Sequence, residues 1–167
     1  MDVVCYTGNG SSQAVSHNLT VIPDLVITKP RSNAGTWYSG INPLTDGHIQ
    51  LNSNAAFSAY DIFGADATTS AFTVTNGTVN TNAYTYIAYL FATLDGVSKV
   101  GSYTGTGADL NVDCGFTAGA RFFLTKRKND LGDWYYWDSA RGISAGNDPY
   151  LLLNSTAAEV TSTDYVD

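Results

Sequence analysis

The chain has 167 residues, a length that suits one domain or two small ones. Its apolar content of 44% is that of a globular chain and argues against intrinsic disorder. Its net charge of −7 argues against a general nucleic-acid binder, because such a protein needs cationic groups to displace phosphate counterions.

The choice of polar residues favours strands over helices. The chain has one Glu (Glu159), four Lys and two Gln, whereas Thr, Ser, Asn, Gly and Tyr are abundant. Strong helix formers are therefore scarce, and β-branched, aromatic and turn residues dominate. We predict an all-β, sandwich-like fold. No apolar run approaches the ~20 residues of a membrane span, and no signal-peptide pattern opens the chain.

In chain order, the first expected strands lie at 3–6 and 13–17. The motif YTGNG (residues 6–10) is expected to form the hairpin turn between them, with Gly8 and Gly10 at positive φ. Further strands are predicted at 24–31, 36–41, 48–52 and 70–75, separated by turn-like segments such as NAGT and TDG. The one helical possibility is 54–64, with Ser53 as a cap.

Residues 84–92, YTYIAYLFA, form a nearly unbroken apolar stretch rich in aromatic residues. We interpret this stretch as a central strand that is covered on both faces. A buried helix is the alternative, but Thr, Ile and three Tyr favour an extended chain.

The sequence then repeats itself. When it is shifted by 97 residues, segment 6–38 lies over 103–135, and YTGTG replaces YTGNG, so that Gly105 and Gly107 match the earlier glycines. Eleven of the 33 positions are identical: Tyr6, Thr7, Gly8, Gly10, Val15, Thr20, Thr28, Lys29, Gly35, Trp37 and Tyr38 with their partners. LNSNAA (51–56) matches LNSTAA (153–158) at an offset of 102, so the second copy carries five extra residues. We predict two tandem β repeats, at 1–97 and 98–167.

Strands are expected in the second copy at 98–104, 110–114, 121–128, 133–138 and 150–154. The second copy stops before any equivalent of the strand at 84–92, and a domain without its central strand leaves backbone groups unpaired. The chain is therefore expected to be a fragment of a longer repetitive polypeptide, or to receive the missing strand from elsewhere. A further possibility is that the two copies pack together as one pseudo-symmetric body.

Few residues point to chemistry. His17 and His48 have no neighbours that suggest a catalytic triad, and no GxSxG, HExxH or Walker motif occurs. Cys5 and Cys114 lack a zinc-like spacing, so two buried thiols are expected, with a disulfide between them as the alternative. The cluster Lys126–Lys128, with Lys29 and Arg31, is interpreted as charge that keeps edge strands soluble.

Trp37 and Trp134 occur in both copies and are expected to anchor each core, because scaffold must be built in every copy whereas a catalytic site is normally built once. The copies diverge in WYYWDSARGISAGNDPY (134–150), where Tyr136, Trp137, Asp138 and Arg141 have no counterparts of like kind. Exposed aromatic rings beside polar groups bind sugars or protein partners, so these four residues are the candidate ligand site. The alternative is that the aromatic residues only cover the two faces of a strand.

The motifs YTGNG, Pro23-Asp24-Leu25-Val26-Ile27 and TYIAYLFA (85–92) resemble a repeated domain of unknown function in virion proteins of tailed bacteriophages. Such domains occur in tail fibre or tail-spike-like proteins, often of marine and cyanobacterial phages. The second copy departs from the pattern with Ala120-Arg121 where Pro-Asp is expected. The resemblance covers nearly the whole chain and carries over no catalytic residue, metal or cofactor.

The resemblance implies a non-enzymatic structural or adhesive module of a phage tail fibre. Its location is then the virion, assembled in the host cytoplasm. The expected partners are other virion tail proteins, further copies of the chain, and host-surface polysaccharide or protein, with no nucleic acid. The alternatives are a carbohydrate-binding module that uses Tyr136 and Trp137, a capsid decoration protein, and a glycan-cleaving enzyme that uses Asp133 and Asp138 with Asp130 nearby. A bound calcium ion is a further possibility, although no EF-hand loop occurs.

Overall fold

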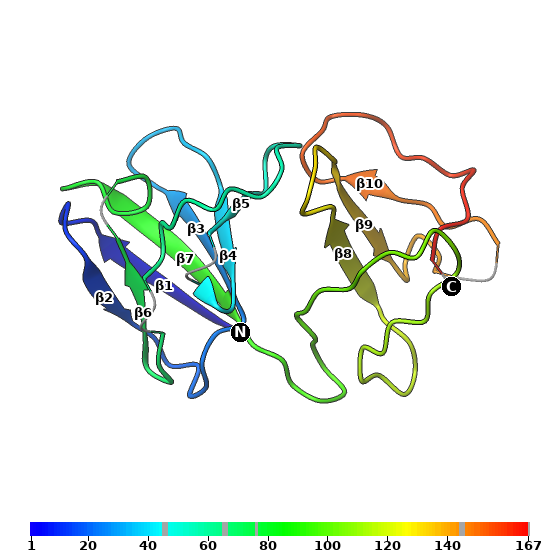
Figure 1. Cartoon of the computed structure of the whole chain (residues 1–167), viewed down its shortest axis with the longest axis horizontal. Coiled ribbons are helices and arrows are strands. Elements are labelled where there is room, and N and C mark those ends of the chain that lie inside the picture. Colours follow the sequence, from blue (N-terminus) through cyan, green and yellow to red (C-terminus); the bar gives the residue numbers. More distant parts are fainter. Residues whose placement is uncertain (45–46, 65–66, 76, 144–145, 167) are drawn as a thin grey trace.

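The computed structural model describes residues 1–44, 47–64, 67–75, 77–143 and 146–166. Within these ranges the chain forms ten strands and no α-helix, which confirms the predicted all-β class (Figure 1). The helix considered at 54–64 is wrong. The segment is extended because its backbone groups bond to other segments, as when Phe57 N donates to the carbonyl of Lys128 at 3.0 Å.

The first half of the chain builds two antiparallel sheets. The larger has the order β1-β7-β3-β4-β5, and the smaller pairs β2 with β6. The strands of the larger sheet are β1 (Asp2–Thr7), β7 (Thr85–Phe91), β3 (Leu25–Pro30), β4 (Tyr38–Ile41) and β5 (Ile49–Gln50). Those of the smaller sheet are β2 (Gln13–Ser16) and β6 (Ala71–Val74). All seven were predicted from the sequence, although most of the predicted strands are longer than the observed ones by one or more residues.

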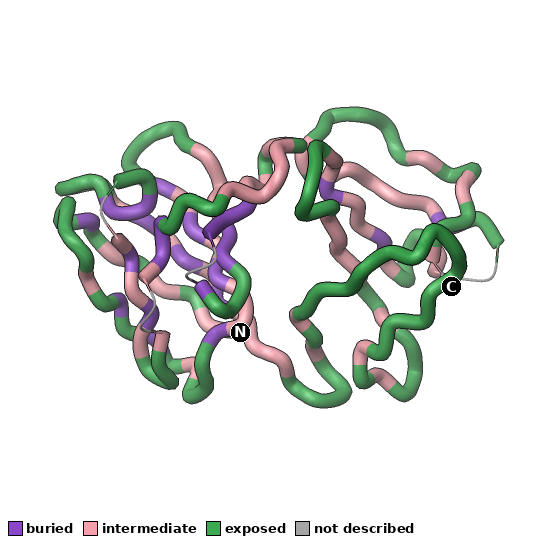
Figure 2. The backbone as a smooth tube through the Cα atoms, in the orientation of Figure 1, coloured by how far each residue is buried: buried purple, intermediate pink, exposed green. Residues whose placement is uncertain are grey.

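The two sheets enclose one apolar core, so this half is a sandwich. Val26 and Leu90 from the larger sheet and Phe72 and Val74 from the smaller sheet are fully buried in one cluster. Figure 2 shows the buried residues gathered in the half of the molecule that contains β1–β7. Strand β7 is central as predicted, between β1 and β3. Only one of its faces is buried, however, and the face that carries Ile87 and Tyr89 is half-exposed.

The turn after β1 differs from the expected hairpin, because β1 and β2 belong to different sheets. Gly10 has a φ of +75° as predicted, but Gly8 does not lie in the left-handed region. Glycine is needed at position 8 for a close approach instead: a Cβ there would lie 2.3 Å from the carbonyl oxygen of Thr81. In the second copy Gly107 has a φ of +81°, and a Cβ on Gly105 would meet nothing within 4 Å.

The second half forms one antiparallel sheet in the order β10-β9-β8. Its strands are β8 (Phe122–Lys126), β9 (Trp134–Asp138) and β10 (Leu151–Leu152). The strands predicted at 98–104 and 110–114 are wrong, and residues 101–113 are exposed and without strand structure. In the first half the corresponding strands β1 and β2 pair with β7 and β6. The second copy, as far as this chain runs, has no equivalents of those partners.

The part of the second copy that does fold repeats the strand pairing and several hydrogen bonds of the first copy. Strands β8, β9 and β10 stand where β3, β4 and β5 stand in the first half. The backbone N–H of Trp37 donates to Asn52 Oδ1 at 3.1 Å, and that of Trp134 donates to Asn154 Oδ1 at 2.7 Å. The bridge His48–Ser58 likewise recurs as Tyr150–Val160. The predicted duplication is therefore present in the hydrogen bonds as well as in the sequence.

Neither cysteine is bonded to the other, and Cys5 is exposed on the edge strand β1 rather than buried, whereas Cys114 is partly buried. The expectation of two buried thiols is thus wrong for Cys5, because the edge strand turns this side chain away from the core.

No described residues form a helix with the length and apolar character to cross a membrane.

Candidate functional site

The segment 134–150, where the two copies diverge, lies on and after β9. One face of β9 carries Tyr135 and Trp137, and the other carries Trp134 and Tyr136. Trp137 is only 3% exposed and packs in an aromatic cluster, with ring centroids 5.6 Å from Phe123, 6.0 Å from Tyr135 and 5.8 Å from Tyr150. Because its ring is enclosed, Trp137 cannot offer a face to a sugar, and the predicted platform role does not fit this residue.

A comparison with the first copy explains why Trp137 is buried. Its counterpart is Gly40, where a Cβ would lie 2.6 Å from the ring of Phe63. In the first half, Phe63 and Leu44 cover this face of the sheet, so there is no room for a side chain at position 40. In the second half, Trp137 fills the equivalent space. Its Nε1 is buried and has no hydrogen-bond partner among the described residues.

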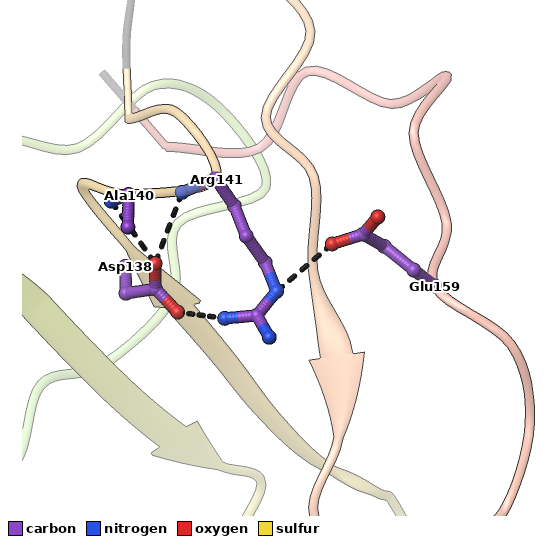
Figure 3. A network of polar contacts seen from close by, with 4 residues as sticks. All are labelled: Asp138, Ala140, Arg141 and Glu159. Carbon is purple, nitrogen blue, oxygen red and sulfur yellow. Dashed lines mark hydrogen bonds and ion pairs between the residues drawn. The ribbon is translucent and has the colours of Figure 1, made fainter.

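The polar residues at the end of β9 and just after it form one network with Glu159, the only glutamate of the chain (Figure 3). Asp138 Oδ1 accepts hydrogen bonds from the backbone N–H groups of Ala140 and Arg141, each at 3.0 Å. The Arg141 guanidinium donates to Asp138 Oδ2 through Nη1, and its Nε lies 2.9 Å from Glu159 Oε1. Two acidic groups from distant segments therefore hold one arginine in place.

These contacts also set the charges of the network. Desolvation opposes ionisation of Asp138, but the hydrogen bonds and positive charge of Arg141 outweigh it and lower the pKa of the carboxyl. Desolvation likewise opposes the charge of Arg141, and Asp138 and Glu159 outweigh it, so its pKa is raised. Both groups are charged at neutral pH.

Tyr136 and Phe122 place two aromatic rings beside this network on the face of the sheet opposite Trp137. Their ring centroids are 5.9 Å apart, and the Arg141 guanidinium lies 5.5 Å from the Tyr136 ring. Phe122 is 58% exposed. Of the four predicted ligand residues, the fold thus brings Tyr136, Asp138 and Arg141 together, and adds Phe122 and Glu159. The sequence offered a signal for Glu159, since it is the sole glutamate, but none for Phe122.

The aspartates considered for glycan cleavage do not form a pair. Asp133 directly precedes β9 and Asp138 is its last residue, so the two residues are roughly 16 Å apart along an extended chain. Paired carboxylates of glycosidases are about 5–9.5 Å apart. Asp133 instead accepts a bond from Asn154 Nδ2 at 2.8 Å, and Asp130 pairs with Arg127 at 3.3 Å.

The two histidines make contacts that are typical of residues with a structural role. His48 Nδ1 lies 2.8 Å from the carbonyl oxygen of Tyr60, and its ring packs edge-on against Tyr38. His17 Nδ1 accepts a bond from the backbone N–H of Leu19 at 3.1 Å. Among the described residues, no three His, Cys, Asp or Glu side chains converge as metal ligands would.

Comparison with known proteins gives one match. The family model described as a domain of unknown function, DUF7483, matches residues 1–167. No curated protein and no solved structure matches the chain.

Proposed function

We propose that this chain, which belongs to the DUF7483 family of domains of unknown function, is a non-enzymatic structural and adhesive module of a bacteriophage tail fibre. The observation that carries this proposal is the repeated scaffold. The hydrogen bonds of Trp37 with Asn52 recur at Trp134 with Asn154, so what the two copies share is framework. Repetition of framework suits a protein whose task is to give shape to an extended assembly.

The phage context rests on the resemblance of YTGNG and TYIAYLFA to virion domains. The test is mass spectrometry of purified virions from a phage that encodes the chain, combined with binding of the recombinant chain to host cells. We expect the chain in the virion at a constant number of copies per particle. Its absence from virions, together with no binding to host cells, would contradict the proposal.

Glycan binding is the second candidate function, and the surface formed by Phe122, Tyr136, Asp138 and Arg141 favours it. An exposed aromatic ring beside a guanidinium and a carboxylate is the combination that holds a sugar ring and its hydroxyl groups. The adhesive part of the proposal would then lie at this surface, and the duplicated strands would only support it.

The test is titration of the chain with host-surface polysaccharide by calorimetry. We expect Phe122→Ala and Arg141→Ala each to weaken binding by about tenfold or more, because hot-spot side chains contribute roughly 1–2 kcal/mol each. Tyr60→Ala is the matched control, since Tyr60 is an aromatic residue that is 65% exposed in the other half of the molecule. Equal loss in all three variants, or no binding by the unmodified chain, would reject a glycan site here.

A further inference from the structure

The two copies touch through one small set of contacts between the segment that follows β5 and the hairpin that joins β8 to β9. Gly132 N donates to the carbonyl of Asn54 at 2.9 Å, and Phe57 N donates to the carbonyl of Lys128 at 3.0 Å. Trp134 Nε1 donates to the carbonyl of Gln50 at 2.8 Å. A non-backbone contact joins the same segments, with Lys128 Nζ 4.2 Å from the centroid of the Phe57 ring.

Because the chain is duplicated, each of the two surfaces in this contact has an equivalent in the other copy. These two equivalent surfaces take no part in the contact between the copies. The first copy has its own hairpin, and the second copy has its own segment after β10. The six positions equivalent to those in contact are Arg31, Gly35 and Trp37 on the hairpin face, and Leu152, Thr156 and Glu159 on the loop face. The hairpin face thus belongs to the first copy and the loop face to the second.

At three of the six paired positions, burial differs between the used and the unused versions in the way that an unoccupied contact requires, and at the other three the burial is alike. Trp134 is 6% exposed, whereas Trp37 is only partly buried. Gly132 is partly buried and its counterpart Gly35 is exposed. Likewise Phe57 is partly buried and its counterpart Glu159 is exposed.

The unused faces are also complementary in charge. At the positions where Lys128 meets Phe57 within the chain, the unused faces carry Arg31 and Glu159. Glu159 contacts Arg141 Nε through Oε1, which leaves Oε2 for a second guanidinium. The cation–ring contact of Lys128 with Phe57 would thus be replaced by an ion pair between Arg31 and Glu159, whose geometry is more specific.

We infer that the hairpin face of one molecule binds the loop face of a second copy of this chain, and thereby repeats between chains the contact that joins the two halves within one. Such an interface is heterologous, because it joins two different surfaces, and it adds copies head to tail. The backbone donors at Gly35 and Glu159 would bond to the carbonyls of Thr156 and Arg31. The inference depends on the duplication alone and holds whether or not the chain belongs to a phage tail.

The test is sedimentation velocity of the full chain from micromolar to millimolar concentration, with two charge reversals. We expect concentration-dependent association of the unmodified chain. Arg31→Glu places two acidic groups opposite each other, and Glu159→Arg places two basic groups opposite each other. Each variant alone should associate more weakly, by a factor of roughly three to thirty in dissociation constant. An equimolar mixture of the two variants restores opposite charges and should associate again.

Lys99→Glu is the matched control, because Lys99 is exposed, lies outside both faces and gives the same change of charge as Arg31→Glu. It should associate as the unmodified chain does. The inference is overturned if the unmodified chain stays monomeric throughout. It is also overturned if the Lys99 variant loses association as strongly as the Arg31 variant, or if the mixture fails to associate. Far-UV circular dichroism of each variant, compared with that of the unmodified chain, separates a loss of association from a loss of folding.

Discussion

The position shared by Gly40 and Trp137 determines how each copy fills the inner face of its sheet. In the first copy a second layer supplies the apolar atoms, and Phe63 and Leu44 would lie only 2.6 Å and 3.1 Å from a Cβ on Gly40. In the second copy the tryptophan supplies them from the strand itself. The second copy lacks this second layer and covers the inner face of its sheet with Trp137, which is why an aromatic run in the sequence marks a core here and not a binding platform.

Gly8 and Gly105 offer a direct test of whether the two copies are equally packed. We predict that Gly8→Ala lowers the free energy of unfolding by about 2 kcal/mol or more, because the added Cβ meets the Thr81 carbonyl at 2.3 Å. Gly105→Ala should change it by less than about 0.5 kcal/mol, since nothing lies within 4 Å of a Cβ there. Urea unfolding of both variants measures this. Equal effects would contradict the difference in packing.

The carboxyl of Asp138 provides a prediction on pH. Its pKa is lowered below the ordinary 3.8 in the folded protein, mainly by Arg141 against the effect of desolvation. A lowered folded-state pKa stabilises the fold above the unfolded-state pKa, and this contribution is lost as pH falls through the folded-state value. We therefore expect Arg141→Ala to raise the pKa of Asp138, as measured by NMR titration of its carboxyl carbon. The pKa of Asp2, which a hydrogen bond from the backbone N–H of Asn18 lowers in the other half of the molecule, should stay unchanged.

At the level of elements, the second copy keeps the strands whose partners it contains and loses the others. In the described part of the chain, the strand pairing of β8, β9 and β10 is only with one another. The counterparts of β1 and β2, at 99–104 and 110–113, would need equivalents of β7 and β6. Strand formation in this protein therefore depends on a partner more than on local propensity.

Amide hydrogen exchange tests this dependence. Residues 2–7 and 13–16, which pair with β7 and β6, are expected to exchange slowly. Within their sequence counterparts, residues 101–104 and 110–113 should exchange at nearly the rate of an unfolded chain, because these residues are exposed and form no strand. Slow exchange in 99–104 would mean that this segment pairs with another strand, from this chain or from a second copy.

The same dependence explains what sequence reasoning could and could not predict. Alternation and turn residues located β3, β4 and β7 well, because each of these segments has the composition and the partner that a strand needs. They failed at 98–104 and 110–114, since a motif copied from the first half carries the propensity of a strand but not its neighbour. The candidate site was predicted in part: Asp138 and Arg141 do meet. The burial of Trp137 depends on the missing second layer, which no pattern within 134–150 reveals.

At the level of the whole molecule, the two halves differ in what stabilises them. The apolar cluster of ten buried residues lies entirely in the first half, between Val15 and Leu90. In the second half the only buried hydrophobic side chains, among the described residues, are Trp134 and Trp137. A smaller buried apolar area gives a smaller hydrophobic contribution to stability.

The three tryptophans make this difference measurable, because Trp37 lies in the first half and the other two lie in the second. We predict that the indole N–H resonances of Trp134 and Trp137 disappear at a lower urea concentration than that of Trp37. The contacts between the halves oppose such a separation, but they are few, and the indole bond of Trp134 to Gln50 is one of them. Phe57→Ala removes the contact with Lys128 and should widen the interval between the two transitions. If all three resonances vanished together in both proteins, the halves would unfold as one cooperative unit, and the short connection between them would be stronger than its contacts indicate.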